Sequence, residues 1–568
     1  MPFKRKSSIR NQTDLPPGAA EYATGLRKWA PMIVLSLALM IVVLDTTILN
    51  VSLKSIVTDL NTDVEGIQWV ITAYSLTLAA FVITGGRLGD LFGRKRMFMV
   101  GAVIFAIGSF ITSISTSISM MIVGEAVICG IGAALMMPAT ASLLISNYSG
   151  RDRALAFGIW GGVAAAASAL GPIVGGILTT SFSWRWGFRI NIFVVVLLLL
   201  GSLLIAESRD RDEKRELDWF GVLLSSTGLF SLVFGVIESS RNGWWVAKET
   251  FTLFGQGLNP FGLSITPIAI ALGVLILIIF GLWQWYQECH GHTPLVSLSL
   301  FANRQFTAGA SVSTMLALGQ TGLVFALPVF LQSVQNLDAL HTGLTMLPMS
   351  LTLLCTAPTA GFMSKYFKPK HLAQTGLLVN ITATLVLRQA LTVDATWTDL
   401  APGLVLYGLG MGLVISQISN LTLSAVSVEE SGEAAGVNSM FRQVGMSFGS
   451  AIIGAALIAS LASNLASGIS SSTTIAAEQR PALAAAVSAQ ASDIEFGGVR
   501  QSREVTELAP EQQQELVAIA HEASAAASRR AIIFTTLFAF MALLISTRLP
   551  NAMNVERGTK PATAVTAH

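Results

Sequence analysis

Long apolar runs separated by short polar connectors dominate the chain. A helix needs about 20 apolar residues to cross a hydrocarbon core of about 30 Å. We identify fourteen such runs, at 30–52, 66–86, 97–116, 119–145, 154–180, 187–206, 217–238, 265–286, 305–333, 340–364, 371–392, 399–426, 435–465 and 530–548. No segment alternates with a period of two over ten residues, so the pattern predicts an all-α integral membrane protein.

Composition agrees with this prediction. Only 12% of the 568 residues are charged, against roughly 25% in soluble proteins. A net charge of +2 gives no overall attraction to nucleic acid. The three cysteines are dispersed, and no disulfide framework is expected. Residues 1–28 lack the apolar core and cleavage site of a signal peptide, so the first run is expected to stay as an anchor.

The distribution of Lys and Arg predicts the orientation. With the N-terminus inside, most of the 35 basic residues fall in cytoplasmic connectors and tails, so both termini are predicted to be cytoplasmic. The predicted organisation is a tail at 1–29, a six-helix bundle at 30–206, two inserted helices with linkers at 207–300, a second six-helix bundle at 301–548 and a tail at 549–568. Within the second bundle, an extracytoplasmic loop at 466–529 contains two helix-like pieces, 478–492 and 509–527. We expect them to form a solvated hairpin, with partner docking as the alternative.

The connector between the second and third runs, residues 85–96, reads GGRLGDLFGRKR. It closely resembles the signature loop of the major facilitator superfamily, which joins transmembrane helices 2 and 3. The resemblance implies a conformational latch against the start of the thirteenth run, around 431–436, and Asp90 is suited to a helix N-terminus or to an Arg partner. The alternative is that the basic residues only fix topology. The latch residues are Gly86, Arg87, Gly89, Asp90, Gly93 and Arg94.

Further motifs resemble the fourteen-span drug/proton antiporter branch of this superfamily. They are LDTTILNV at 44–51, QWVITAY at 68–74, a glycine-rich stretch at 161–176, WRW at 184–186 with Asn191, FLQ at 330–332 and the segment 436–449 around Arg442. The resemblance implies the major facilitator fold, with 14 transmembrane helices as two six-helix bundles plus two inserted helices. It also implies alternating access and export of lipophilic or drug-like molecules across the cell membrane, driven by a proton gradient without a cofactor.

Asp45 lies inside the first apolar run. A carboxylate near the middle of a membrane helix costs about 2.5–3.5 kcal/mol on insertion scales, so it should face an aqueous cavity or a partner. Proton coupling is the functional interpretation, supported by the resemblance. The alternative is a structural Asp that bonds Thr46, Thr47 or a neighbouring helix.

Glu125 departs from the family pattern. The family usually has an Arg in its fourth span, shortly before a glycine-rich stretch. Here that stretch is 130–134, no Arg precedes it, and Glu125 is the nearest ionisable residue. If Glu125 faces the cavity near Asp45, the two carboxylates titrate as a coupled pair. The alternative is a Glu near the membrane surface or bonded to a helix terminus, and the missing Arg weakens any proton relay carried over from the family.

The glycine-rich stretch of the fifth run resembles the so-called antiporter motif. Pro172 removes a backbone hydrogen bond and kinks the helix, while the small residues permit close helix packing. The resemblance implies that this helix seals one side of the cavity and favours antiport; a purely packing role is the alternative. The motif residues are Gly161, Gly162, Gly171, Pro172, Gly175 and Gly176.

Four amides are candidates for lining the substrate cavity: Asn50, Gln320, Gln417 and Asn420. Amides inside a bundle often only bond neighbouring helices, which is the alternative. The 29 Phe and 11 Trp residues suit an apolar or aromatic substrate. Cys289, His290 and His292 do not supply four ligands at credible spacing, so no metal site is predicted.

Other function classes remain as alternatives. A uniporter or proton symporter of a small metabolite fits the same fold, as does a non-transporting membrane sensor. An enzyme is not expected, because the sequence has no ATP-binding Gly-Lys-Ser loop and no catalytic constellation inside the membrane. The expected partners are a lipophilic small molecule, protons and membrane lipid, with no nucleic acid. The oligomeric state is left open.

Overall fold

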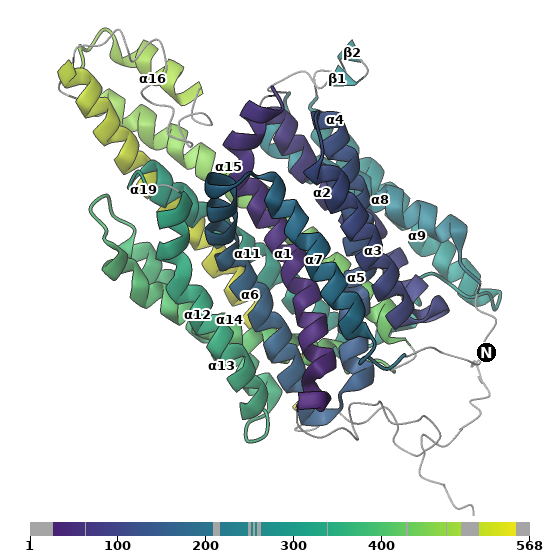
Figure 1. The fold of residues 1–568 in the computed structure, drawn as a ribbon. Helices are drawn as coiled ribbons and strands as arrows, with labels where there is room; N and C mark the ends of the chain where they lie inside the picture. The colour runs from purple at the N-terminus through teal and green to yellow at the C-terminus, as the bar shows by residue number, and fades with distance from the viewer. Residues whose placement is uncertain are drawn as a thin grey trace, which may run out of the picture.

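The computed structural model describes residues 26–62, 64–207, 216–247, 252–253, 256–257, 263–337, 339–427, 430–472, 474–489 and 510–551. The described part is almost entirely helical (Figure 1). Each of the fourteen apolar runs falls on helical structure, and most of the ends differ from the prediction by a few residues, as helix ends commonly do. The exception is the last run, whose helix begins about 20 residues earlier. Most of both predicted tails, 1–25 and 552–568, lies outside the described residues.

The first half of the chain forms one bundle. Its fourth member is a continuous helical stretch of three pieces, of which the middle one is a π-helix. The elements are α1 (Leu26–Asp59), α2 (Val64–Phe92), α3 (Arg94–Ser113), α4 (Ile118–Met121), η2 (Ile122–Cys129), α5 (Gly130–Asn147), α6 (Gly150–Ser181) and α7 (Arg185–Ser202).

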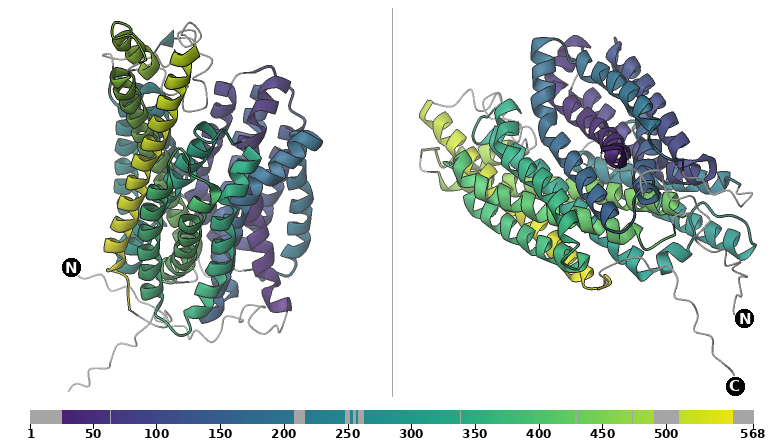
Figure 2. Two further views of the ribbon diagram at one scale, coloured as in Figure 1. Left: turned by 90° about the vertical axis from the view of Figure 1, so that its left-hand side faces the viewer. Right: turned by 60° about the horizontal axis from the view of Figure 1, so that its bottom comes forward.

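The second half forms another bundle beside the first (Figures 1 and 2). Its elements are α10 (Ser299–Ala302), α11 (Arg304–Ser333), α12 (Ala339–Met363), α13 (Pro369–Ala390), α14 (Trp397–Leu423), α15 (Ser431–Ser471), α16 (Arg480–Ala489) and α19 (Pro510–Ser546). Fully buried side chains form separate clusters. Phe98 and Phe105 lie in one cluster, and Phe330 and Leu331 lie in another.

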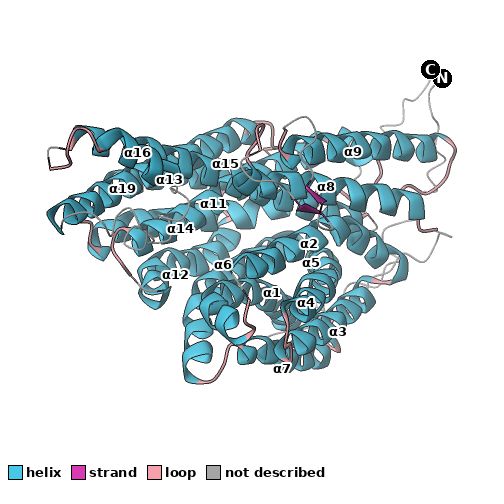
Figure 3. Ribbon diagram, turned by 90° about the horizontal axis from the view of Figure 1, so that it is seen from above, coloured by secondary structure: helices cyan, strands magenta, loops and turns pink. Residues whose placement is uncertain are grey.

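Two helices lie between the halves in sequence and outside them in space. α8 (Trp219–Asn242) and α9 (Ile265–Cys289) pack against each other at one edge of the molecule (Figure 3). Their connector carries the antiparallel strands β1 (Thr252–Leu253) and β2 (Gln256–Gly257). α8 contacts α2, where the Trp69 and Phe234 rings stack at 6.2 Å. We call α8 and α9 the inserted hairpin.

Twelve helical stretches of the described chain are long and apolar enough to cross a membrane. They coincide with twelve of the predicted runs. The helices at the other two runs, α6 with 32 residues and α13 with 22, are not among these twelve. Several side chains of α6 lie outside the described part of the chain. α13 carries Lys370 and Arg388 near its ends, which lowers its hydropathy. The fold is therefore an all-helical membrane fold with twelve candidate spans among the described residues.

Two helices continue well beyond the rest of the bundle. α15 has 41 residues and α19 has 37, so each is about 55–60 Å long at 1.5 Å per residue. Their projecting ends pack with α16 around Ile469, Leu483 and Leu516, at the upper left of Figure 1. The helix-like pieces expected at 478–492 and 509–527 are confirmed as α16 and the beginning of α19. The second begins at Pro510 and continues without a break into the last apolar run, because the Ala-rich segment contains no helix breaker.

Candidate functional site

Asp45 lies in the interior of the first bundle. Its side chain on α1 is 0% exposed. Asn191 of α7 donates a hydrogen bond of 2.6 Å from Nδ2 to Asp45 Oδ1. The same amide nitrogen donates to Ser109 Oγ of α3 at 3.1 Å. A hydrogen bond from an uncharged amide stabilises a carboxylate without neutralising it.

Glu125 is carried by the π-helix η2 and is equally buried, at 1% exposure. Thr112 of α3 donates from Oγ1 to Glu125 Oε2 at 3.2 Å. Close packing of glycines makes this contact: a Cβ on Gly108 would lie 2.6 Å from the nitrogen of Cys129, and a Cβ on Gly124 would lie 2.9 Å from the nitrogen of Thr112. Two helix backbones therefore approach so closely that polar groups of α3 reach η2.

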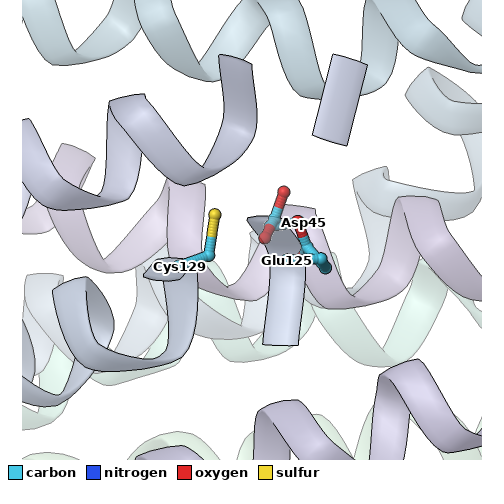
Figure 4. Close-up of side chains that lie close together, drawn as sticks. All are labelled: Asp45, Glu125 and Cys129. Carbon is cyan, nitrogen blue, oxygen red and sulfur yellow. The ribbon is translucent and has the colours of Figure 1, made fainter. Parts of the chain in front are cut away.

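The two carboxyl groups and the thiol of Cys129 come together from α1 and η2 (Figure 4). The ligand atoms of these three side chains lie within 4.8 Å of one another. We call Asp45 and Glu125 the carboxyl pair. Three ligands are one fewer than a closed zinc site uses, and the Cys129 thiol donates to the Phe105 carbonyl oxygen at 3.4 Å. Among the described residues no other such group of three is found.

No basic side chain in the described part of the chain forms an ion pair with either member of the pair. Glu125 is the ionisable residue nearest to the place where the family usually carries an Arg. Tyr74 of α2 lies within electrostatic reach of both carboxyl groups. Within the described residues its hydroxyl has no hydrogen-bond partner.

The latch residues lie at the junction of the two halves. Asp90 Oδ1 accepts from the Gly432 nitrogen at 3.2 Å, and Oδ2 accepts from the Glu433 nitrogen at 2.8 Å. Arg94 donates to Asp90 Oδ1 at 2.7 Å. The carboxylate thus occupies the N-terminus of α15, in the segment predicted from sequence, where the helix dipole favours negative charge.

The latch glycines have different roles. A Cβ on Gly86 would lie 2.4 Å from the Gly432 carbonyl oxygen, so only glycine permits this approach of α2 to α15. Gly93 has a φ of +106°, a conformation that L side chains rarely adopt. Two residues later, the backbone nitrogen of Lys95 donates to Glu207. Gly89 makes only ordinary contacts. Arg87 pairs with Glu433 Oε2 at 3.8 Å.

The glycines of the antiporter motif divide between two neighbours. A Cβ on Gly161 would lie 2.5 Å from Ile415 of the second half, whereas a Cβ on Gly171 would meet the Thr47 hydroxyl of α1 at 1.8 Å. Gly162 packs on α12 and Gly175 on α1 at ordinary or slightly tight distances, and Gly176 meets nothing within 4 Å. Pro172 lies in α6, with its side chain outside the described part.

The predicted cavity amides lie in different surroundings. Gln417 is fully buried and donates to the Ala360 carbonyl oxygen at 2.9 Å, a contact between helices of the second half. Gln320 lines a cavity of about 10 Å³ inside the same bundle with Asn380 and Tyr407, room for at most one water. Asn420 is 8% exposed. Asn50 lies in α1, and its side chain is outside the described part.

The model of the Major Facilitator Superfamily matches residues 35–450, which is most of the chain. The chain belongs to this superfamily. The match covers the carboxyl pair, the latch and the antiporter motif. Members of the superfamily are membrane transporters and not enzymes, so the buried carboxyl groups belong to a transport protein.

Curated relatives of this superfamily member include export, transport and efflux proteins. The tetracenomycin C resistance and export protein of Streptomyces glaucescens is 30% identical over 78% of this chain and 79% of its own. The probable actinorhodin transporter of Streptomyces coelicolor is 30% identical over 75% and 72%. The multidrug efflux pump LfrA of Mycolicibacterium smegmatis is 29% identical over 77% and 82%.

Solved structures of the superfamily share the fold. The proton:xylose symporter XylE aligns with a TM-score of 0.52 over 90% of this chain and 95% of its own, at 13% identity. A bacterial homologue of the human lysosomal transporter Spinster aligns with a TM-score of 0.54 over 93% and 98%, at 15% identity. At these identities the likeness concerns the fold alone.

Several residues around the carboxyl pair and the latch were not among the predicted site residues. Asn191 stood in a recognised motif, but sequence spacing gave no sign that it reaches Asp45, which is 146 residues away. Thr112, Ser109 and Cys129 gave no signal, since hydroxyl and thiol groups are common in membrane helices. Glu433 was detectable as an acid in the first turn of a helix facing the latch.

Proposed function

We propose that the protein is a proton-coupled antiporter that exports lipophilic, drug-like small molecules across the cell membrane by alternating access. The observation that carries this proposal is the buried carboxyl pair, Asp45 and Glu125, with no basic ion-pair partner among the described residues. The export function of the tetracenomycin and multidrug relatives supports the direction of transport.

The carboxyl pair has the chemistry for exchange. Two ionised carboxylates this close repel each other, so a proton on one of them relieves the repulsion. A substrate with a cationic or hydrogen-bonding group relieves it equally and competes with the proton for the site. The energy is sufficient: one charge moving through 100 mV releases about 2.3 kcal/mol, and each pH unit adds about 1.4 kcal/mol.

Fourteen membrane crossings belong to this proposal, including α6 and α13. Contacts at both ends support the crossing of α6. Asp152 near its beginning pairs with Lys28 at the beginning of α1, whereas Trp184, just after its end, donates to Asp59 at the end of α1. α13 likewise meets both ends of the crossing part of α19, through Lys370 with the Thr547 carbonyl oxygen and Arg529 with the Leu391 carbonyl oxygen.

The orientation follows from the number of membrane crossings. With fourteen crossings the beginning of α1 and the end of α19 lie on one side, and the basic connectors make that side the cytoplasm. The latch then closes the cytoplasmic side of the pathway. Asp90 at the N-terminus of α15 holds the halves together there, and the site opens to the cytoplasm when α2 and α15 separate.

The test is proton movement in proteoliposomes with a pH-sensitive dye inside. Ethidium serves as a lipophilic cation and an uncharged anthraquinone as a neutral probe. We expect substrate-dependent proton flux in the parent protein and its loss, by at least tenfold, in Asp45→Asn. The control is Asp152→Asn, which removes an acid near the membrane surface from the same bundle and should leave the flux unchanged.

The other outcomes separate the remaining interpretations. Flux that survives Asp45→Asn but is lost in Glu125→Gln transfers the coupling role to Glu125. Substrate movement without proton movement contradicts the antiporter and favours the uniporter. Absence of transport with both probes, in a protein that still binds them, favours the sensor.

A further inference from the structure

The segment 293–298 connects the inserted hairpin to the second bundle, and we call it the strap. Four successive backbone N–H groups of the strap, those of residues 295 to 298, each donate to a side chain from another element. Consecutive amides bonded in this way fix the path of an irregular segment. Leu295 and Val296 are buried in a core cluster that contains residues of both halves.

On one side the strap is held by α9. Gln284, which is 0% exposed, accepts from the nitrogens of Leu295 at 2.7 Å and Val296 at 3.3 Å. Its own amide donates to Asp218 at 2.9 Å, and Asp218 caps the N-terminus of α8. Glu288 accepts from the Leu298 nitrogen at 2.6 Å. The strap is therefore fixed to both helices of the inserted hairpin.

On the other side the strap meets the latch. The Ser297 nitrogen donates to Glu433 Oε1 at 2.5 Å. The second oxygen of Glu433 pairs with Arg87, and the Glu433 backbone nitrogen donates to Asp90. One buried residue of α15 thus contacts the strap with one oxygen and two latch residues with its other polar groups.

The inserted hairpin also holds the first half directly. Ser226 of α8 donates to the Ala80 carbonyl oxygen of α2 at 2.9 Å, and Phe234 stacks on Trp69 of α2. α2 and α15 are the two helices that the latch joins. The inserted hairpin contacts α2 through α8, and it contacts the first turn of α15 through the strap.

We propose that the inserted hairpin is a working part of the gate at the latch: through the strap, Gln284 and Glu433 act as positioning residues that hold α2 and α15 together. The inference rests on the proposed function only in requiring that this end of the pathway opens during transport. Separation of α2 from α15 then has to break either the Glu433–strap contact or the contacts of α8 with α2. Loss of the strap hydrogen bonds favours the open gate.

The test measures opening by the labelling of a cysteine at the closed junction. Val437 of α15 is fully buried in the core cluster that the two halves share. Val437→Cys is introduced in a background with Cys289→Ser and Cys355→Ser, which removes the two exposed thiols. The reagent is a membrane-impermeant maleimide, applied to the protein in nanodiscs without substrate.

Gln284→Met keeps the length of the side chain and removes both hydrogen bonds to the strap, while every latch residue stays unchanged. We expect labelling to accelerate about three- to tenfold, the effect of losing one to two hydrogen bonds. Glu288→Met, at the partly exposed end of α9, should accelerate it in the same direction. The matched control is Thr293→Ala, whose exposed hydroxyl donates to the Glu216 carbonyl oxygen and to no other residue in the described part of the chain. This variant should label like the parent.

Parent-like labelling in Glu288→Met and in any folded Gln284→Met protein overturns the proposal and makes the strap a passive connector. If Gln284→Met does not fold, Glu288→Met decides alone. Equal acceleration in Thr293→Ala also overturns it, since the effect is then not specific to the bonded amides. The assay uses neither substrate nor a proton gradient, so its outcome is separate from that of the antiport experiment.

Discussion

The two halves of this transporter treat their buried polar groups differently. In the first half, Asp45 and Glu125 face each other, and among the described residues only neutral groups bond them. In the second half, Gln417 is bound to a neighbouring helix backbone and Gln320 lines a space of water size. The first bundle thus brings two carboxyl groups together in its interior, whereas these two amides of the second bundle join helices or border a small space.

The largest effect should come from Asn191→Leu. This change removes the amide donor to Asp45 at 2.6 Å, a hydrogen bond to a charged group worth about 1.5–3 kcal/mol. We expect substrate-driven proton flux in proteoliposomes to fall at least tenfold while the protein still folds. A parent-like flux would show that Asp45 does not depend on its neutral partner, and the contrast between the halves would lose its functional meaning.

A smaller effect is expected from Gln417→Leu in the second half. The Ala360 carbonyl oxygen keeps its helical hydrogen bond from Ser364 when the amide is removed, so the cost in unfolding free energy should stay below about 1.5 kcal/mol. Proton flux should remain within twofold of the parent. Thermal unfolding in nanodiscs and the flux assay measure both quantities, and a flux loss as large as that of Asn191→Leu would erase the proposed division between the halves.

The smallest effect concerns a third acid of the first half, Asp59, which does have a basic partner. Its hydrogen bond from Arg185 lowers the pKa of this carboxyl below its ordinary value, and Trp184 adds a further hydrogen bond. A lowered folded-state pKa stabilises the fold above the ordinary pKa of about 3.9, and this stability is lost as pH falls through the folded value.

Asp59→Asn should therefore lower the unfolding temperature at neutral pH and make no difference in strong acid. The expected cost is below about 1 kcal/mol, since the side chain is half exposed and solvent screens the pair. Unfolding temperatures between about pH 7 and pH 3 test it. A loss of proton flux in this variant would contradict the assignment of coupling to the buried pair.

Much of the fold could be predicted from the sequence because membrane helices are recognisable as long apolar runs. The fourteen apolar runs were visible in the chain. The contact of Asp90 with the segment 431–436 was implied by the resemblance to the superfamily. The continuity of α19 through Pro510–Ser546 was not visible, because an Ala-rich helix outside the membrane has no hydropathy signal.

The site was less predictable than the fold. Asp45 and Glu125 could be nominated as rare membrane acids, but their proximity depends on how α1 and η2 pack. The contact of Asn191 with Asp45 and the bonds of the strap to Gln284 and Glu433 join residues that are far apart in the chain or lie on irregular backbone. Such contacts arise from tertiary packing, which periodicity does not encode.

The placement of the Glu125 side chain depends on the π-helix η2. A π-helix arises when an α-helix accommodates an extra residue, and its turns are wider for that reason. Deletion of one residue within Ile122–Cys129 would let the helix return to the ordinary α register, turning the preceding side chains by about 100°. Whether Glu125 faces Asp45 therefore depends on helix register as much as on residue type. Insertion or deletion of a single codon is enough for a lineage to gain or lose the carboxyl pair.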